Sequence, residues 1–206
     1  MKTADGVPPN PERVSDLLRQ MRDTAAREDV ITVGNILQLC GVRGFAFLLL
    51  ALALLNIVIF MVPFISILFG LPMVILSAQL VLGLRAPIFP DAIRHRTIKR
   101  EPFIAGIDRA IRAVEALERF IKPRFTFISD PKFTRIHGLA ALIMSIMVAL
   151  PIPVVNVPPS IGLVMLALGI LTRDGIFILI GYAIGVWCLW LFKSLGHIAH
   201  TVAKNA

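Results

Sequence analysis

The chain has few charged residues and long stretches with none. Only 17% of its 206 residues are Asp, Glu, Lys or Arg, whereas these four make up about a quarter of an ordinary soluble domain. Residues 44–84, 138–172 and 175–192 contain no Asp, Glu, Lys, Arg or His. Apolar runs of this length are typical of membrane-spanning helices. The scarcity of charge therefore excludes an ordinary soluble globular domain and indicates an integral membrane protein.

Several functional classes need residues that this chain lacks. Its two cysteines, Cys40 and Cys188, have no paired spacing, which excludes a disulfide framework. His197 and His200 alone make a weak ligand pair, so we expect no metal site and no cofactor. The sequence contains no nucleophile triad motif, catalytic carboxylate pair or phosphate-binding glycine loop, and we expect a protein that is not an enzyme. The charge-free runs also offer no carboxylates for a proton relay.

The positive charge is concentrated in one segment. The net charge is +8, yet residues 1–43 carry six basic and six acidic residues, whereas residues 85–137 carry twelve and six. Basic residues accumulate in the cytoplasmic loops of membrane proteins. Because no recognition motif accompanies the charge, we expect no nucleic-acid partner. No cleavable signal precedes the first apolar run, so that run is expected to direct insertion itself.

These patterns predict an all-α, polytopic integral membrane protein with two proline-broken helical hairpins, a final transmembrane helix and amphipathic cytoplasmic helices. The predicted segments are a cytoplasmic tail with an amphipathic helix pair (1–43), a first membrane hairpin (44–84), a basic amphipathic connector (85–137), a second membrane or re-entrant hairpin (138–172), and a last transmembrane helix with a tail (173–206).

The first apolar run is too long for one helix across a bilayer. Its 41 residues would extend ~62 Å as a helix, twice the ~30 Å of a hydrocarbon core. Pro63 lies near its centre and is the expected turn between helices over 44–62 and 66–84. Pro72 is a second candidate break, because proline removes a backbone donor.

The second run is interrupted by four prolines, at positions 151, 153, 158 and 159. We expect Pro151, Pro153, Pro158 and Pro159 to exclude helix, leaving helices over 139–150 and 161–172 of only ~18 Å each. These form either a re-entrant hairpin or two thin, tilted crossings, and the sequence favours neither. At an offset of 90 residues Pro153 aligns with Pro63, which indicates an internal repeat of the two hairpins.

Three further helices are expected outside the two runs. Residues 175–192 form one span of ~27 Å with aromatic anchors, and Asp174 can cap its N-terminus. Residues 12–28 have apolar side chains at helical spacing, with a second short helix from Thr32 to Cys40. Residues 102–122 form an amphipathic helix that lies either on the membrane surface or on the protein's own helical bundle.

Uncharged polar residues lie deep in the apolar runs. They act either as hydrogen-bonding glue between helices or as a substrate path. The candidates for such a path or for the turns are Asn56, Ser66, Gln79, Asn156 and Ser160. Arg85 and Arg173 follow the two runs. They are candidate contacts for phosphate head groups, or markers of the cytoplasmic side.

The order of these motifs resembles the ExoD family of bacterial exopolysaccharide-synthesis membrane proteins. The resemblance is carried by ITVGNILQLCGVRGFAFLLL (31–50), GLPMVILSAQLVLG (70–83), the basic connector, PIPVVNVPPSIGLVMLALGIL (151–171) and Arg173-Asp174-Gly175. It implies a multi-pass protein of the bacterial inner membrane with a role in exopolysaccharide synthesis. It supplies no catalytic residues.

Two interpretations of function follow. The first is a small transporter or translocation factor for a lipid-linked or ionic species. The second is a non-catalytic structural or assembly protein that recruits polysaccharide-synthesis enzymes. The expected partners are the lipid bilayer, a second copy of the chain and polysaccharide-synthesis proteins. Gly181 and Gly185 are the best candidate for a dimer face, because their GxxxG spacing allows close helix contact.

Overall fold

The computed structural model describes residues 14–27, 31–32, 41–59, 65–88, 97–98, 126–150 and 156–205, and residues 101, 104–109, 111, 112 and 115 of the connector. The chain forms two compact units. Unit 1 combines residues 1–44 with 86–122, and unit 2 combines residues 45–85 with 123–206. Pro63, Pro151 and Pro153 and the expected helix over 33–40 lie outside the described residues.

Unit 1 joins the N-terminal segment to the connector. Helix α1 (Val14–Arg27) confirms the amphipathic helix predicted over 12–28. Thr32, expected to cap a helix, lies instead in strand β1 (Ile31–Thr32), which pairs antiparallel with β2 (Thr97–Ile98). Leu18 and Met21 of α1 are buried, as are Ile107 and Ile111 of the connector. These four apolar side chains are therefore shielded from solvent.

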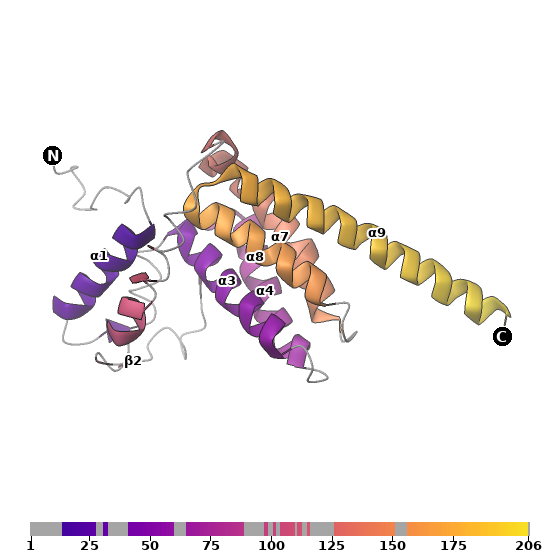
Figure 1. Cartoon of the computed structure of the whole chain (residues 1–206), viewed down its shortest axis with the longest axis horizontal. Coiled ribbons are helices and arrows are strands. Elements are labelled where there is room, and N and C mark those ends of the chain that lie inside the picture. The colour runs from indigo at the N-terminus through magenta and orange to yellow at the C-terminus, as the bar shows by residue number, and fades with distance from the viewer. Residues whose placement is uncertain are drawn as a thin grey trace. The chain divides into compact units, whose positions relative to one another are not determined.

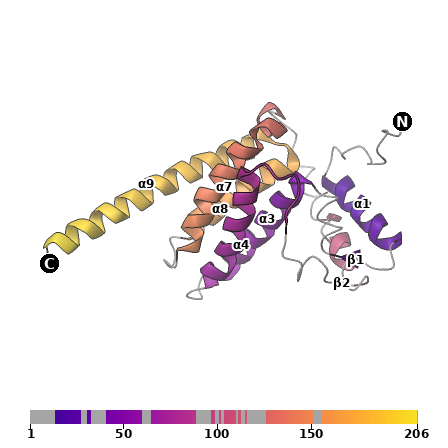
Figure 2. The ribbon, with the colours of Figure 1, turned by 180° about the vertical axis from the view of Figure 1, so that it is seen from behind.

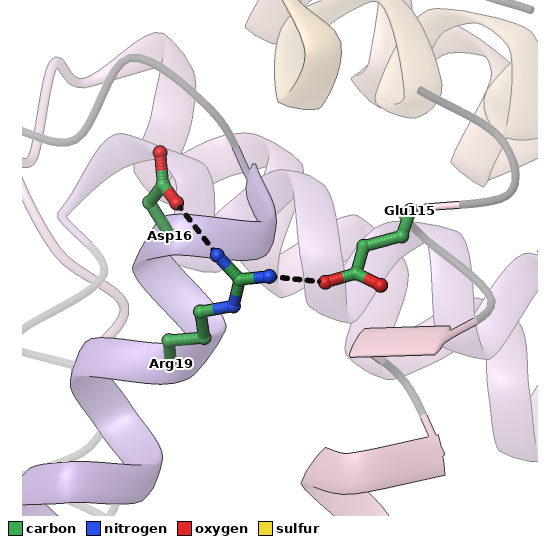
Figure 3. Close-up of polar contacts among 3 residues, drawn as sticks. All are labelled: Asp16, Arg19 and Glu115. Carbon is green, nitrogen blue, oxygen red and sulfur yellow. Dashed lines mark hydrogen bonds and ion pairs between the residues drawn. The ribbon is translucent and has the colours of Figure 1, made fainter. Parts of the chain in front are cut away.

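Ion pairs tie α1 to the connector (Figure 3). Arg19 lies between Asp16 and Glu115, 3.4 Å and 2.5 Å from their carboxylate oxygens. Arg22 pairs with Asp108 at 3.0 Å. Because all of these side chains are substantially exposed, each pair contributes at most about 1 kcal/mol. These contacts pack the connector against α1, and they leave both interpretations of the connector, on the membrane surface or on the bundle, as predictions.

Unit 2 is a helical bundle (Figures 1 and 2). Its main helices are α3 (Val42–Ile59), α4 (Ile65–Val81), α7 (Thr134–Ala149), α8 (Val157–Thr172) and α9 (Gly175–Asn205), with 3-10 turns at Thr126–Ser129 and Pro131–Phe133. The predicted all-α class is confirmed for the described residues, apart from the two-residue strands of unit 1.

Glycines let these helices approach one another closely. A Cβ on Gly70 would lie 2.6 Å from the Cα of Ala149, and one on Gly138 would lie 2.7 Å from the nitrogen of Val81. The start of α4 therefore meets the end of α7, and the end of α4 meets the start of α7. Small residues at such contacts permit the backbone proximity on which helix association in lipid depends.

Helices α8 and α9 are also antiparallel. A Cβ on Gly181 would lie 2.9 Å from the nitrogen of Leu166, and Ile184 lies beside Gly162. Gly185 faces Met144 of α7. The GxxxG pair predicted as a dimer face is thus used inside the chain, because both glycines already contact neighbouring helices.

The antiparallel packing gives unit 2 two distinct ends. At the basic end, α4 and α8 finish and α7 and α9 begin, and this end carries Arg85, Arg135 and Arg173. At the opposite end, here called the amide end, α4 and α8 begin and α7 finishes. Asn56, in the last turns of α3, is hydrogen-bonded there to Ser160 of α8. The two hairpins, α3–α4 and α7–α8, therefore have the same orientation.

Three predicted proline breaks do not end helices. Pro72 lies inside α4, which continues to Val81. Pro158 and Pro159 lie in the first turn of α8, which begins at Val157 and not near residue 161. The first turn of a helix tolerates proline because its N–H groups have no intrahelical acceptor. As a result α8 has 16 residues and extends ~24 Å and not ~18 Å, and α7 has the same length because it begins at Thr134 and not near residue 139.

Helix α9 is longer than the predicted span over 175–192. It has 31 residues, or ~46 Å, and it continues past the start of α8 (Figures 1 and 2). Its N-terminus has the predicted cap, because the Asp174 carboxylate accepts a hydrogen bond of 2.9 Å from the N–H of Ile176. Arg173, in the left-handed conformation (φ 56°), makes the sharp turn between α8 and α9.

Unit 2 buries an apolar core, and it also exposes large apolar side chains and buries several polar ones. Large apolar side chains are exposed on every main helix, among them Val58, Leu68, Leu139, Ile161 and Val186. Polar side chains are buried between the helices: Asn56, Ser66, Ser77, His137, Ser145, Asn156 and Ser160. Among the described residues two helices are long and apolar enough to cross a membrane, Val42–Ile59 and Gly175–Ser194, and three shorter apolar helices accompany them.

The glycine contacts predict opposite effects on stability for two Gly→Ala substitutions. In a helix, Gly→Ala ordinarily stabilises by up to about 1 kcal/mol. We expect Gly70→Ala to destabilise unit 2 by about 1–3 kcal/mol, because its methyl would collide with the Ala149 backbone. Gly185→Ala, whose Cβ would lie 3.4 Å from the flexible Met144 side chain, is the matched control. Thermal unfolding followed by circular dichroism measures both, and equal stabilities would contradict the close packing of α4 and α7.

Candidate functional site

Three buried polar residues meet at the amide end, and we call them the amide cluster: Asn56, Asn156 and Ser160. Their exposed fractions are 0%, 2% and 0%. The Ser160 hydroxyl lies 3.0 Å from Asn56 Oδ1 and 2.8 Å from the carbonyl oxygen of Asn156. The cluster therefore connects the end of α3 to the first turn of α8.

The two prolines of α8 explain why Asn156 does not cap its own helix. An asparagine at the N-cap normally accepts a hydrogen bond from the second or third N–H of the helix. Those positions are Pro158 and Pro159, which have no N–H. The Asn156 side chain accordingly makes no capping hydrogen bond, and its Oδ1 is buried without a partner.

Asn56 also has an atom without a partner. Its Oδ1 accepts from Ser160, and its Nδ2 is buried with no hydrogen bond. Turning the amide over would let Nδ2 donate to Ser160 and leave Oδ1 unsatisfied, so one atom lacks a partner in either orientation. Each such buried group costs about 1–3 kcal/mol. Unsatisfied polar groups in a folded protein commonly mark a bound water, an ion or a functional site.

The other two predicted path residues, Ser66 and Gln79, lie on α4. Ser66 is buried in the first turn of α4, close in sequence to its start at the amide end. Gln79 is half-buried near the end of α4, toward the basic end. Ser77 and Ser145, also polar residues of the apolar runs, share a buried hydrogen bond of 3.1 Å between α4 and α7. This last pair is helix glue, and three of the five predicted residues, Asn56, Asn156 and Ser160, lie together in the described part of the chain.

A second polar contact near the basic end has no counterpart in the sequence prediction. His137 Nε2 lies 2.9 Å from the carbonyl oxygen of Ile128, and Nδ1 lies 2.5 Å from the Tyr182 hydroxyl. Since a carbonyl can only accept, Nε2 carries the proton, and Tyr182 donates to Nδ1 of the neutral ring. The contact connects α7 to α9. Its signal in the sequence is slight: the protein's one tyrosine, and a histidine immediately before an apolar run.

The two candidate head-group residues are at the basic end. Arg85 is exposed beyond the end of α4, and Arg173 is half-exposed beyond the end of α8. The Arg135 guanidinium lies beside Gly83, where a Cβ would be 3.1 Å from its Nε. These arginines make the end of both hairpins cationic. Within the described part of the chain, no three His, Cys, Asp or Glu side chains are grouped as metal ligands.

Comparison with known proteins places the chain in a family. Residues 14–194 match the family model described as exopolysaccharide synthesis, ExoD. The chain belongs to the ExoD family. The match covers both units, including α1, both hairpins and most of α9. The family model thus confirms the resemblance seen in the motifs, and the family description links the chain to exopolysaccharide synthesis.

One curated relative is Protein ExoD of Rhizobium meliloti (strain 1021). It is 28% identical over 200 residues, which cover 92% of this chain and 83% of the relative. No solved structure gives a significant match. The arrangement of the amide cluster therefore comes from this structure alone.

The contact between His137 and Tyr182 gives a second prediction. Tyr182→Phe leaves His137 Nδ1 buried without a donor, and we expect it to destabilise unit 2 by about 1–3 kcal/mol. His137→Phe/Tyr182→Phe removes both polar partners and should cost less than the sum of the single changes. Trp187→Phe, at an exposed site, is the control. Additive losses measured by thermal unfolding would contradict a direct hydrogen bond.

Proposed function

We propose that this chain is a multi-pass protein of the bacterial inner membrane that supports exopolysaccharide synthesis as a small, non-catalytic transporter or translocation factor. One observation carries the proposal: unit 2 exposes apolar side chains and buries a polar cluster with unsatisfied atoms. In a soluble protein this apolar surface would be exposed to water, which is unfavourable. A protein that moves a polar species through lipid needs both features.

The exposed apolar surface supports insertion in a bilayer. Val58, Leu82 and Val186 are 77%, 72% and 66% exposed, and similar side chains cover all five helices. Contiguous apolar surface of this extent marks a membrane or partner interface. Lipid is the occupant that matches apolar side chains around the whole bundle, since one partner protein would cover a single face. The buried serines and asparagines then lie where hydrogen bonds between membrane helices are found.

The lengths of the helices favour crossings over a re-entrant hairpin. Helices α3, α4, α7 and α8 have 16–18 residues, or ~24–27 Å each, close to the ~30 Å of a hydrocarbon core. The arginines support a cytoplasmic location for the basic end. Both hairpins enter from that side, so the amide end lies at the far side of the membrane. Because α9 is antiparallel to α8, it delivers Lys193 and Lys204 to the far side as well.

The amide cluster is the proposed contact for the moving species. Its location at the far end of both hairpins suits a release or hand-over step, and Arg85 and Arg173 at the cytoplasmic end suit an anionic head group on entry. No titratable group belongs to the cluster, so the proposed step is binding and passage without bond cleavage.

An assembly function is the second candidate, and unit 1 supports it. The ion pairs of Arg19 with Glu115 and of Arg22 with Asp108 make the N-terminal segment and the connector one compact body outside the apolar runs. Such a body suits the recruitment of synthesis enzymes. Deleting residues 1–40 separates the two functions, because an assembly factor would fail and a transporter would retain most of its output.

Polysaccharide output tests the proposed function. In a deletion strain, Asn56→Leu/Asn156→Leu is expected to reach the membrane at the wild-type level and to restore less than about one tenth of the output. Ser77→Ala/Ser145→Ala removes a buried hydrogen bond of similar size outside the cluster, and it should restore most of the output. Full restoration by the asparagine variant would reduce the cluster to helix glue. An unchanged output in the deletion strain would contradict any function in exopolysaccharide synthesis.

A further inference from the structure

Helix α9 is longer than the helix on which it packs. Gly181 faces Leu166 of α8, and Cys188, two turns further along α9, is buried. Because the two helices are antiparallel, α8 reaches its first residue, Val157, soon after this point. Helix α9 continues for roughly five more turns to Asn205 (Figures 1 and 2). Its last part therefore extends past the helix that covers its first half.

The apolar stripe of α9 continues in the sequence of this last part. After Cys188, apolar residues recur at alternating spacings of three and four: Leu191, Leu195, Ile198 and Val202. Positions with this spacing share one face of a helix, and a repeat of three and four is the pattern of a coiled-coil seam. Polar residues occupy other faces, and four of them are exposed: Lys193, His197, Thr201 and Lys204. Residues 191–205 are thus amphipathic.

Lipid hydrocarbon does not match the end of α9. The apolar span of the helix is Gly175–Ser194, whose 20 residues extend ~30 Å, the thickness of a hydrocarbon core. Residues 195–205 lie beyond that length. Since α9 is one helix from Gly175 to Asn205, this part projects from the span and does not turn onto the membrane surface. An apolar stripe that projects into water is stabilised by a partner helix.

We propose that the stripe formed by Leu191, Leu195, Ile198 and Val202 is a self-association face, and that its partner is the same stripe of a second copy of this chain. Insertion gives all copies one orientation, so their α9 helices emerge parallel and on the same side of the membrane. Equal residues then meet across the seam, as in a parallel two-stranded coiled coil. This inference goes beyond the proposed function, from which it takes only the membrane location.

The charges of this segment are compatible with the pairing of identical helices. The heptad positions that flank the seam are occupied by uncharged residues: Phe192, Ser194, Ala199 and Thr201. Lys193 and Lys204 fall at outer positions of the heptad, so the lysines of two copies do not oppose one another. A different partner helix with an acidic face would be recognised by basic residues beside the seam, and these positions hold none.

The membrane compensates for the short length of the seam. An isolated helix of about 15 residues is marginal in water, because its first turn is costly to form. The end of α9 continues a helix that is already formed through its span. Two copies held in one membrane also have a high effective concentration. Two heptads are therefore enough to pair the copies.

Single cysteines in native membranes test the seam, in the full chain with Cys40 and Cys188 replaced by alanine. We expect oxidation to give at least ~tenfold more cross-linked dimer from Leu195→Cys and Val202→Cys, on the seam, than from the matched controls His197→Cys and Lys204→Cys. Copies that carry two different tags identify both halves of the product. Equal cross-linking at the four positions, no cross-linked dimer, or a product that contains another protein would each overturn the proposal.

Charge substitution provides a second measurement, by Förster transfer between donor-labelled and acceptor-labelled copies in phospholipid vesicles. Leu195→Glu/Val202→Glu places like charges opposite one another across the seam, so we expect the transfer to fall to the level of unpaired chains. His197→Glu/Lys204→Glu introduces the same side chains at outer positions and should retain the wild-type transfer. Both variants should unfold at the wild-type temperature, because the substituted positions lie past the packed part of α9.

No transfer in the wild type, or wild-type transfer in the seam variant, would contradict the proposal. Neither measurement depends on polysaccharide output, so self-association and the proposed function can fail separately.

Discussion

Close backbone contact between helices is the constraint on which the rest of unit 2 depends. In the bilayer that we propose for unit 2, lipid tails are as apolar as leucine, so helices would gain little by burying apolar side chains against one another. They associate through contact and through hydrogen bonds instead. Gly70 against Ala149 and Gly181 against Leu166 provide the contact. Ser77 with Ser145 adds a hydrogen bond between α4 and α7, and Tyr182 with His137 adds one between α9 and α7.

The antiparallel contacts also decide where the polar groups can meet. Because α4 and α7 run in opposite directions, the end of α3 and the start of α8 lie at the same end of the bundle. That geometry places Asn56 of the first hairpin within hydrogen-bonding distance of Ser160 in the second. Pro158 and Pro159 then remove the N–H groups that would satisfy Asn156. The result is a polar cluster in which some atoms have no hydrogen-bond partner. It requires both the helix packing and the two prolines.

The sequence predicted the elements of this fold better than their contacts. Charge-free runs located all five helices of unit 2, because burial in lipid and burial in protein both exclude charge. The proline rule failed at α8, because a rule for helix interiors was applied to a first turn, where proline is tolerated. It failed at Pro72 as well, where α4 continues on both sides of the ring.

The candidate site was predictable only in part. Asn56, Asn156 and Ser160 stood out as polar residues in apolar runs, but their meeting depends on the register between the two hairpins, which no local pattern encodes. Gln79 had the same appearance and lies near the other end of α4. His137 escaped notice because its partner Tyr182 is 45 residues away and contributes no charge or motif.

We propose that unit 2 lies in lipid with its basic end in the cytoplasm. The most direct test labels single cysteines with a membrane-impermeant maleimide in spheroplasts, after replacement of Cys40 and Cys188. We predict that Lys204→Cys reacts from outside, that Arg85→Cys reacts only after the membrane is opened, and that Val58→Cys reacts in neither case. The last result follows because a thiol in hydrocarbon does not ionise. Rapid labelling of Val58→Cys, which is 77% exposed in the isolated chain, would show that water and not lipid covers this surface.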